Sequence, residues 1–141
     1  MCTPSYSLCS SKGACIPLFL KVKLLPLELQ YYKKISNLMY DINTSSAPIN
    51  ISILFSKITS VHSYGTRSST SEHFYTKKSA LNVQSKAFSR VGVKIWNGIP
   101  TSLKNSSKNS FKNSIRTRLI EILETENSYV DIDTLINKMK D

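Results

Sequence analysis

The side chains that could carry acid–base or nucleophilic chemistry are few and scattered along this 141-residue sequence. Neither histidine, His62 nor His73, has a nearby acid or nucleophile in a catalytic arrangement. Only three isolated carboxylates precede residue 121: Glu28, Asp41 and Glu72. The paired carboxylates of a two-metal site are therefore lacking, as are the Walker, GxGxxG and GxSxG motifs. We predict no catalytic residue and no enzymatic activity, and we expect His62 to be a hydrogen-bonding turn residue.

The three cysteines, Cys2, Cys9 and Cys15, all lie at the start of the chain. Their spacing lacks the CxxC pairs of zinc sites, and both histidines are distant in sequence, so we expect no metal and no cofactor. An odd cysteine count without a convincing signal peptide favours reduced thiols inside the cell, in the nucleus or the cytoplasm. The apolar run Ile16–Leu20 is too short for a membrane span or a signal-peptide core, so no membrane partner is expected.

Positive charge is concentrated in the middle of the chain. The net charge is +10, and no acidic side chain occurs from His73 to Ile120. The last twenty-one residues, by contrast, are rich in acids. A basic block of this kind attracts polyanions and steers their approach, which predicts contact with RNA or DNA. The alternative is a lysine surface that is merely solvated.

The candidate nucleic-acid contacts come from this basic block. Three of them recur every four residues on one side of a predicted helix, opposite an apolar face. Aromatic rings flanked by cations are candidate stacking platforms for bases, whereas Trp96 falls on the apolar face and is expected in the core. The predicted phosphate contacts are Arg67, Lys77, Lys78, Lys86, Arg90, Lys94, Lys112 and Arg116, and the predicted stacking residues are Tyr64, Phe74 and Tyr75.

Apolar periodicity predicts a mainly α fold, a small helical domain. Helices are expected over residues 27–42, 86–98, 108–125 and 133–139, and the run 51–58 favours a short helix over a strand. Apolar residues fall below the usual share of roughly 45–50%, so the core is expected to be thin. In the first helix the predicted inward stripe is Leu27, Tyr31, Ile35, Leu38, Met39 and Ile42.

Two segments have β-leaning residues instead. Residues 61–67 and 74–81 could pair as an irregular hairpin, or could be extended arms without a sheet. The organisation expected along the chain is an unstructured start at 1–13, a helical segment at 14–60, and a basic hairpin and helix module at 61–141 with an acidic end.

In the helix expected at 108–125, basic residues stand at the start and acidic residues at the end. This order opposes the helix dipole and costs a few tenths of a kcal/mol per residue. An anionic partner at the basic end would account for it, and so would the charge preferences of a larger parent protein.

Several short motifs, taken in their order and spacing, carry a resemblance to a known family. They are Ile16–Phe19, Leu25–Leu27, Leu38–Asp41, His62–Arg67, Phe88–Gly92, Trp96–Pro100 and Phe111–Lys112. Through them the chain resembles the carboxy-terminal region of jockey-like non-LTR retrotransposon reverse transcriptases, the RNA-directed DNA polymerases of these mobile elements. The resemblance covers nearly the whole chain except about the first thirteen residues, which look like an unrelated start.

The resemblance implies a tail without catalytic residues, because the family's palm domain with its metal-binding aspartates lies upstream of this region. The chain itself contains no Asp-Asp pair. The expected function is therefore that of a non-catalytic tail fragment that contacts RNA or DNA, and the missing polymerase domain is a second expected partner. The alternative is a structural remnant of a truncated retroelement product, with no binding activity of its own.

Overall fold

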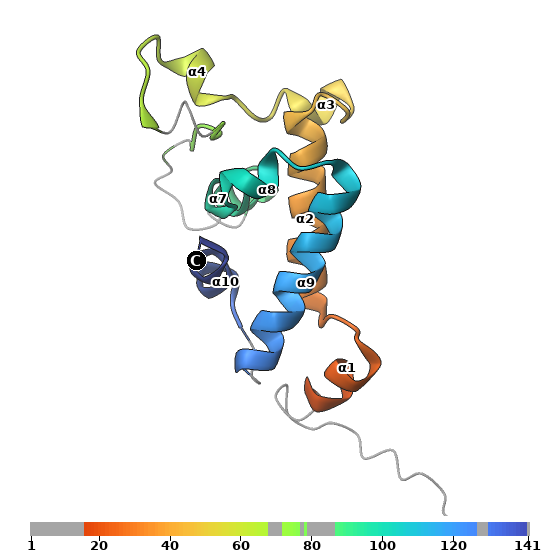
Figure 1. Ribbon diagram of the computed structural model, residues 1–141. Helices are drawn as coiled ribbons and strands as arrows, with labels where there is room; N and C mark the ends of the chain where they lie inside the picture. Colours follow the sequence, from red (N-terminus) through yellow and green to blue (C-terminus); the bar gives the residue numbers. More distant parts are fainter. Residues whose placement is uncertain (1–15, 68–71, 77, 79–86, 127–129, 141) are drawn as a thin grey trace, which may run out of the picture.

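The computed structural model describes residues 16–67, 72–76, 78, 87–126 and 130–140, and these ranges form a mainly helical domain, as the sequence predicted (Figure 1). Within them the helices are α1 (Ile16–Val22), α2 (Leu27–Asn43), α3 (Ile49–Ser52), α4 (Ile58–Val61), α7 (Phe88–Gly98), α8 (Thr101–Lys104), α9 (Lys108–Glu126) and α10 (Ile132–Lys140). The start predicted to be unstructured, residues 1–13, lies outside the described residues.

The two longest helices, α2 and α9, lie side by side and run in opposite directions (Figure 1). Helix α7 packs on α2, α10 packs on both α7 and α9, and α1 and α8 pack on α9. Helices from before and after residue 60 thus share one core. Its largest fully buried side chains are Trp96, Tyr32, Phe111, Met39, Ile95 and Ile115.

Three helices begin directly after a proline. Pro26, Pro48 and Pro100 have φ angles of −54°, −56° and −58° and precede α2, α3 and α8. The proline ring fixes φ near the helical value and the following residue can enter the helix at once. The helices predicted at 27–42, 86–98, 108–125 and 133–139 are confirmed within two residues at each described end, as α2, α7, α9 and α10.

For helix α9, the sequence predicts an inward face of Phe111, Ile115, Leu119 and Ile122 and a cap at Ser107. Phe111, Ile115 and Leu119 are fully buried, and the next inward residue is Leu123 where Ile122 was expected. The Ser107 hydroxyl accepts the Ser110 N–H at 3.4 Å, which satisfies one of the free donors at the helix start.

The predicted inward stripe of α2 is only partly correct. Ile35, Met39 and Ile42 are buried, but Leu27 is 80% exposed and Tyr31 is 43% exposed. Because α7 and α9 pack on two sides of α2, its buried face is wide and centred between them. The core residues of α2 are Leu29, Tyr32, Ile35, Ser36, Met39, Tyr40 and Ile42.

A hairpin was one of two alternatives for residues 61–67 and 74–81, and the parts of both segments that the structure describes contain no strand. Phe74 forms a single antiparallel bridge, and its partner is Lys57. The Asn97 side chain accepts the Phe74 N–H and donates to the Phe74 carbonyl, each at 3.0 Å. The amide of Asn97 thus takes the place of a second strand, and α7 rather than a sheet holds this segment.

The apolar run at 51–58 is not one helix. It is divided between the single turn of α3, a non-helical stretch and the start of α4. Phe55 is buried in that stretch between Phe74 and Phe88, with ring centroids 5.9 and 5.7 Å away. Ile53 and Leu54 are exposed.

Candidate nucleic-acid interface

The register of α2 against α9 is fixed near the start of α9. The Lys108 ammonium pairs with the Asp41 carboxylate at 2.7 Å. Close by, the Tyr40 hydroxyl donates to the Ser106 carbonyl at 2.7 Å. Because the helices run in opposite directions, the residues that follow Lys108 in α9 meet residues that precede Asp41 in α2.

Four cations gather where these later residues meet. Lys33 and Lys34 come from α2, and Lys112 and Arg116 come from α9. The pKa of Lys33 is lowered by burial first, and then by the positive charges of Arg116, Lys34 and Lys112. We call this group the cationic seam.

No ion pair joins a member of the cationic seam to an acidic side chain in the part of the chain that the structure describes. Arg116 donates a long hydrogen bond from its guanidinium to the Lys23 carbonyl, at 3.5 Å. Cations that repel each other without a counter-charge favour the approach of an anion. The cationic seam therefore suits a row of phosphates.

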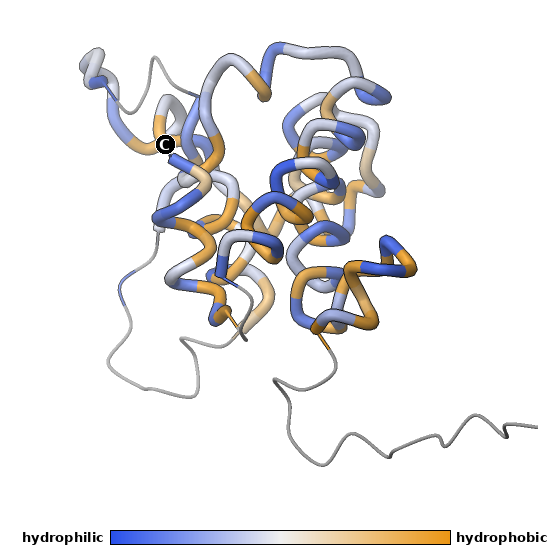
Figure 2. The backbone as a smooth tube through the Cα atoms, turned by 60° about the horizontal axis from the view of Figure 1, so that its bottom comes forward, coloured by the Kyte–Doolittle hydropathy of each residue, from blue (hydrophilic) through white to orange (hydrophobic). Residues whose placement is uncertain are grey.

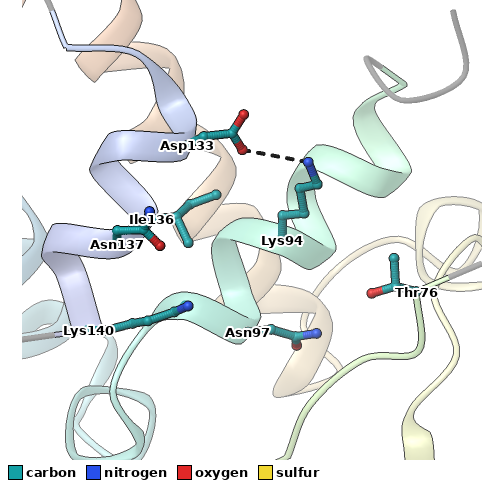
Figure 3. A pocket seen from close by; sticks show the side chains of 8 residues that line it. Thr76, Lys94, Asn97, Asp133, Ile136, Asn137 and Lys140 are labelled. Atoms are coloured by element: carbon teal, nitrogen blue, oxygen red, sulfur yellow. Dashed lines mark ion pairs between the residues drawn. The ribbon is translucent and has the colours of Figure 1, made fainter. Parts of the chain in front are cut away.

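The predicted cationic stripe on α7 has a different setting. Lys94 pairs with Asp133 of α10 at 3.6 Å, and both side chains are at least half exposed (Figure 3). Beside this pair lies an open pocket of about 320 Å³ that Lys140 and Asn137 also line. Helix α10 thus supplies a carboxylate to the face of α7 that was expected to be purely cationic.

The remaining predicted phosphate contacts are dispersed. Arg90 is partly buried and lines a small cavity with Tyr75 and Val93. Arg67 and Lys78 are exposed. Lys77 and Lys86 lie outside the described residues. Two of the eight predicted residues, Lys112 and Arg116, belong to the cationic seam, where they lie near Lys33 and Lys34.

Two of the three predicted stacking residues lie at the surface. Tyr64 is 68% exposed and stacks on His62 with ring centroids 5.7 Å apart, and the exposed Tyr75 lies edge-on to the same imidazole. Phe74, however, is only 2% exposed, because it packs against Phe55 and Trp96. The prediction of Phe74 as a stacking platform for bases is wrong.

Trp96 is fully buried, as predicted for a core residue. Its indole N–H donates to the Glu72 carbonyl at 3.1 Å. The Lys104 ammonium lies 5.2 Å from the ring centroid and is itself buried. Burial lowers the pKa of Lys104 to about 8, with Glu72 opposing the shift, and burial and Lys104 together lower the pKa of His73. Lys104 thus belongs to the core and not to the ligand-facing surface.

Sequence reasoning missed Lys33 and Lys34 as members of the site. Their place depends on how α2 and α9 are aligned, a contact across some eighty residues of sequence that helical periodicity does not encode. The available signal was the Lys-Lys pair itself, in a helix whose only acids are Glu28 and Asp41.

Comparisons with family models, curated proteins and solved structures find no match to this chain. Among the described residues there is no group of three or more His, Cys, Asp and Glu side chains that could hold a metal ion. In the same residues no helix has both the length and the apolar character needed to cross a membrane.

Proposed function

We propose that this chain is a non-catalytic tail of a jockey-like retrotransposon reverse transcriptase that contacts the backbone of RNA or DNA through the cationic seam. The observation that carries the binding proposal is the convergence of Lys33, Lys34, Lys112 and Arg116 without an acidic partner in the described residues. The order and spacing of the motifs from Ile16 to Lys112 support the family.

Phosphate contact by the cationic seam gives affinity with little sequence preference. Each phosphate that a lysine or arginine neutralises releases condensed counterions, so binding weakens as salt rises. Base reading requires polar side chains fixed on an element that fits a groove, whereas the cationic seam offers charges on an open helix pair. The exposed Tyr64 and Tyr75, with Arg67 and Lys78 nearby in sequence, provide a second contact for unpaired bases.

Two double variants test which basic face binds. Lys112→Glu/Arg116→Glu reverses half of the cationic seam, and the new carboxylates lie beside Lys33, so the fold is expected to persist. Arg90→Glu/Lys94→Glu is the matched control on α7, with the same change of charge. Affinity for a fluorescent single-stranded RNA and for a DNA duplex is measured by anisotropy at low salt.

The variant in the cationic seam is expected to bind at least about tenfold more weakly than the wild type, and the α7 variant is expected to lose clearly less. Thermal melting followed by circular dichroism checks that both variants are folded. Equal losses would indicate a response to net charge alone. A larger loss for the α7 variant would move the interface to the pocket beside Lys94.

The structural alternative, a remnant that binds nothing, is favoured by one observation. Several lysines are used inside the fold: Lys94 pairs with Asp133, Lys108 with Asp41 and Lys138 with Glu126. If this alternative holds, wild type and both variants will bind RNA and DNA equally poorly at physiological salt.

The family proposal has a separate test in the genomic sequence upstream of the Met1 codon. A reading frame there that encodes a polymerase palm with paired aspartates would support it. An upstream sequence with no trace of a polymerase would count against it.

A further inference from the structure

Exposed apolar side chains are concentrated at the junction of α1 and α2. Five large apolar side chains within fourteen residues are between 43% and 80% exposed, and they define what we call the apolar patch: Leu18, Val22, Leu24, Leu27 and Tyr31. In Figure 2, the tube through α1 and its connection to α2 carries orange, hydrophobic positions interrupted by blue ones. Exposed apolar residues grouped in this way are typical of an interaction site.

Ordered backbone holds the apolar patch in place. Leu18 and Val22 are four residues apart on α1, and Leu27 and Tyr31 are four apart on α2, so each pair lies on one side of its helix. A tight turn joins the helices, with Lys23 in the left-handed conformation at a φ of 53°.

Buried residues of the α1–α2 junction pack into the core and hold it in place. Ile16, Leu25 and Leu29 are each at most 7% exposed, and α1 packs on α9. The exposed apolar side chains therefore belong to a segment that is packed against the core.

The charges around the apolar patch select the partner. Within the segment from Ile16 to Lys34, the exposed Lys21, Lys23 and Lys34 stand against one acid, Glu28. A second copy of this chain would bring the same cations face to face, and its net charge of +10 would oppose the approach. Helix α10 of such a copy carries Asp133 against Lys138 and Lys140, and it has no apolar face to offer, because Leu135, Ile136 and Met139 are buried in its own core.

We propose that the apolar patch binds an acidic amphipathic helix of another protein. Apolar side chains at i and i+4 on two neighbouring helices suit leucine-type anchors at helical spacing, and the surrounding lysines suit glutamates that flank those anchors. The apolar patch adjoins the cationic seam, because Lys34 belongs to the seam and Arg116 donates to the Lys23 carbonyl. Substitutions at Leu27 and Tyr31 separate the two surfaces, because they remove no charge.

A designed peptide serves as the probe. It has about 18 residues, leucines at alternating spacings of three and four, and glutamate and alanine elsewhere, with blocked ends. One control peptide has the same composition in scrambled order, and another has lysine in place of glutamate. Binding of the labelled peptides to the full chain is measured by fluorescence anisotropy.

Leu27→Ser/Tyr31→Ser removes two exposed anchors of the apolar patch and is expected to weaken binding of the acidic peptide at least about tenfold. Ile53→Ser/Leu54→Ser is the matched control: these residues are 70% and 54% exposed at the opposite end of α2. That control should bind the peptide as the wild type does. RNA binding, measured in parallel, should be the same in both variants.

Several results would overturn the proposal. They are no saturable binding of the acidic peptide, equal binding of the scrambled or lysine peptide, and equal affinity of the apolar-patch variant and the wild type. Self-association at micromolar concentration that the Leu27→Ser/Tyr31→Ser change abolishes would assign the surface to a second copy. Tighter binding to phosphatidylcholine vesicles with roughly one third phosphatidylserine than to the peptide would assign it to a lipid surface.

Discussion

Trp96→Ala is expected to remove the centre of the core. The indole is fully buried, with the rings of Tyr40, Phe74 and Phe111 at centroid distances of 6.5, 6.3 and 6.1 Å. These three neighbours come from α2, from the segment before α7, and from α9. A single truncation therefore leaves a cavity at the point where three parts of the chain meet.

The expected loss of unfolding free energy is large for this fold. Truncation of a buried tryptophan costs about 3–5 kcal/mol. The part-buried hydrogen bond from the indole to the Glu72 carbonyl also disappears, which costs about 0.5–1.5 kcal/mol. Because a domain of this size has a total stability of about 5–15 kcal/mol, the variant is expected to be marginally folded or unfolded at room temperature.

Urea unfolding followed by far-ultraviolet circular dichroism measures this loss, since the variant has no tryptophan fluorescence. Tyr31→Ala is the matched control, because this aromatic side chain is 43% exposed and its removal is expected to cost about 0.5 kcal/mol or less. A loss below about 1 kcal/mol for Trp96→Ala, or equal losses in the two variants, would refute the assignment of Trp96 to the centre of the core.

Three further perturbations test the packing and the charges. Because the pKa of Lys104 is lowered to about 8, the unfolded state binds more protons than the folded state above that pH. The unfolding free energy, measured by urea titration, should therefore rise on the order of 1–2 kcal/mol from pH 8 to about 10. Lys104→Met should flatten this rise. Gly98→Ala would place a Cβ 2.7 Å from Ile136 Cγ2 and should lower the unfolding free energy by about 1–3 kcal/mol in the same assay. Gly92→Ala would meet the flexible Met39 sulfur at 3.0 Å and should be nearly neutral. Equal losses in the two variants would contradict the close approach of α10 to α7. Lys23→Gly should raise the melting midpoint by relieving the left-handed φ of 53°, a gain of about 0.5–1 kcal/mol, and a lower midpoint would show that the lysine side chain stabilises the turn.

Helical periodicity was sufficient to predict the main elements from the sequence. The helices now seen as α2, α7, α9 and α10 have apolar residues at spacings of three and four. Pro26 marks the start of α2 and Ser107 the start of α9. Trp96 in the core followed from its place on the apolar face of α7. These features depend on neighbours within one helix, which is the range over which sequence patterns are informative.

The errors concern contacts between distant segments. Phe74 was taken for an exposed stacking residue because cations surround it in sequence, whereas Asn97 and Trp96 of α7 bind its segment and bury the ring. Of the two alternatives for residues 61–67 and 74–81, the hairpin has no strand among the described residues, where the Asn97 amide pairs with the N–H and the carbonyl of Phe74. Leu27 and Tyr31 lie on a side of α2 away from its buried face, and so they remain exposed although Leu29 and Tyr32 in the same turns are buried.

The cationic seam could not be predicted from the basic block alone. Its α2 members lie outside that block, and only the alignment of α2 with α9 brings Lys33 next to Lys112 and Arg116. Conversely, Lys94 lies within the block but faces Asp133 of α10, an acid that follows it by 39 residues.

The most direct test of nucleic-acid binding by the cationic seam is the salt dependence of affinity. The logarithm of the association constant for a DNA duplex is plotted against the logarithm of salt concentration for the wild type and for Lys112→Gln/Arg116→Gln. Neutralising two phosphate contacts should make the slope shallower by about two units, roughly one for each contact. Parallel lines for the two proteins would contradict the proposal that these residues contact phosphates.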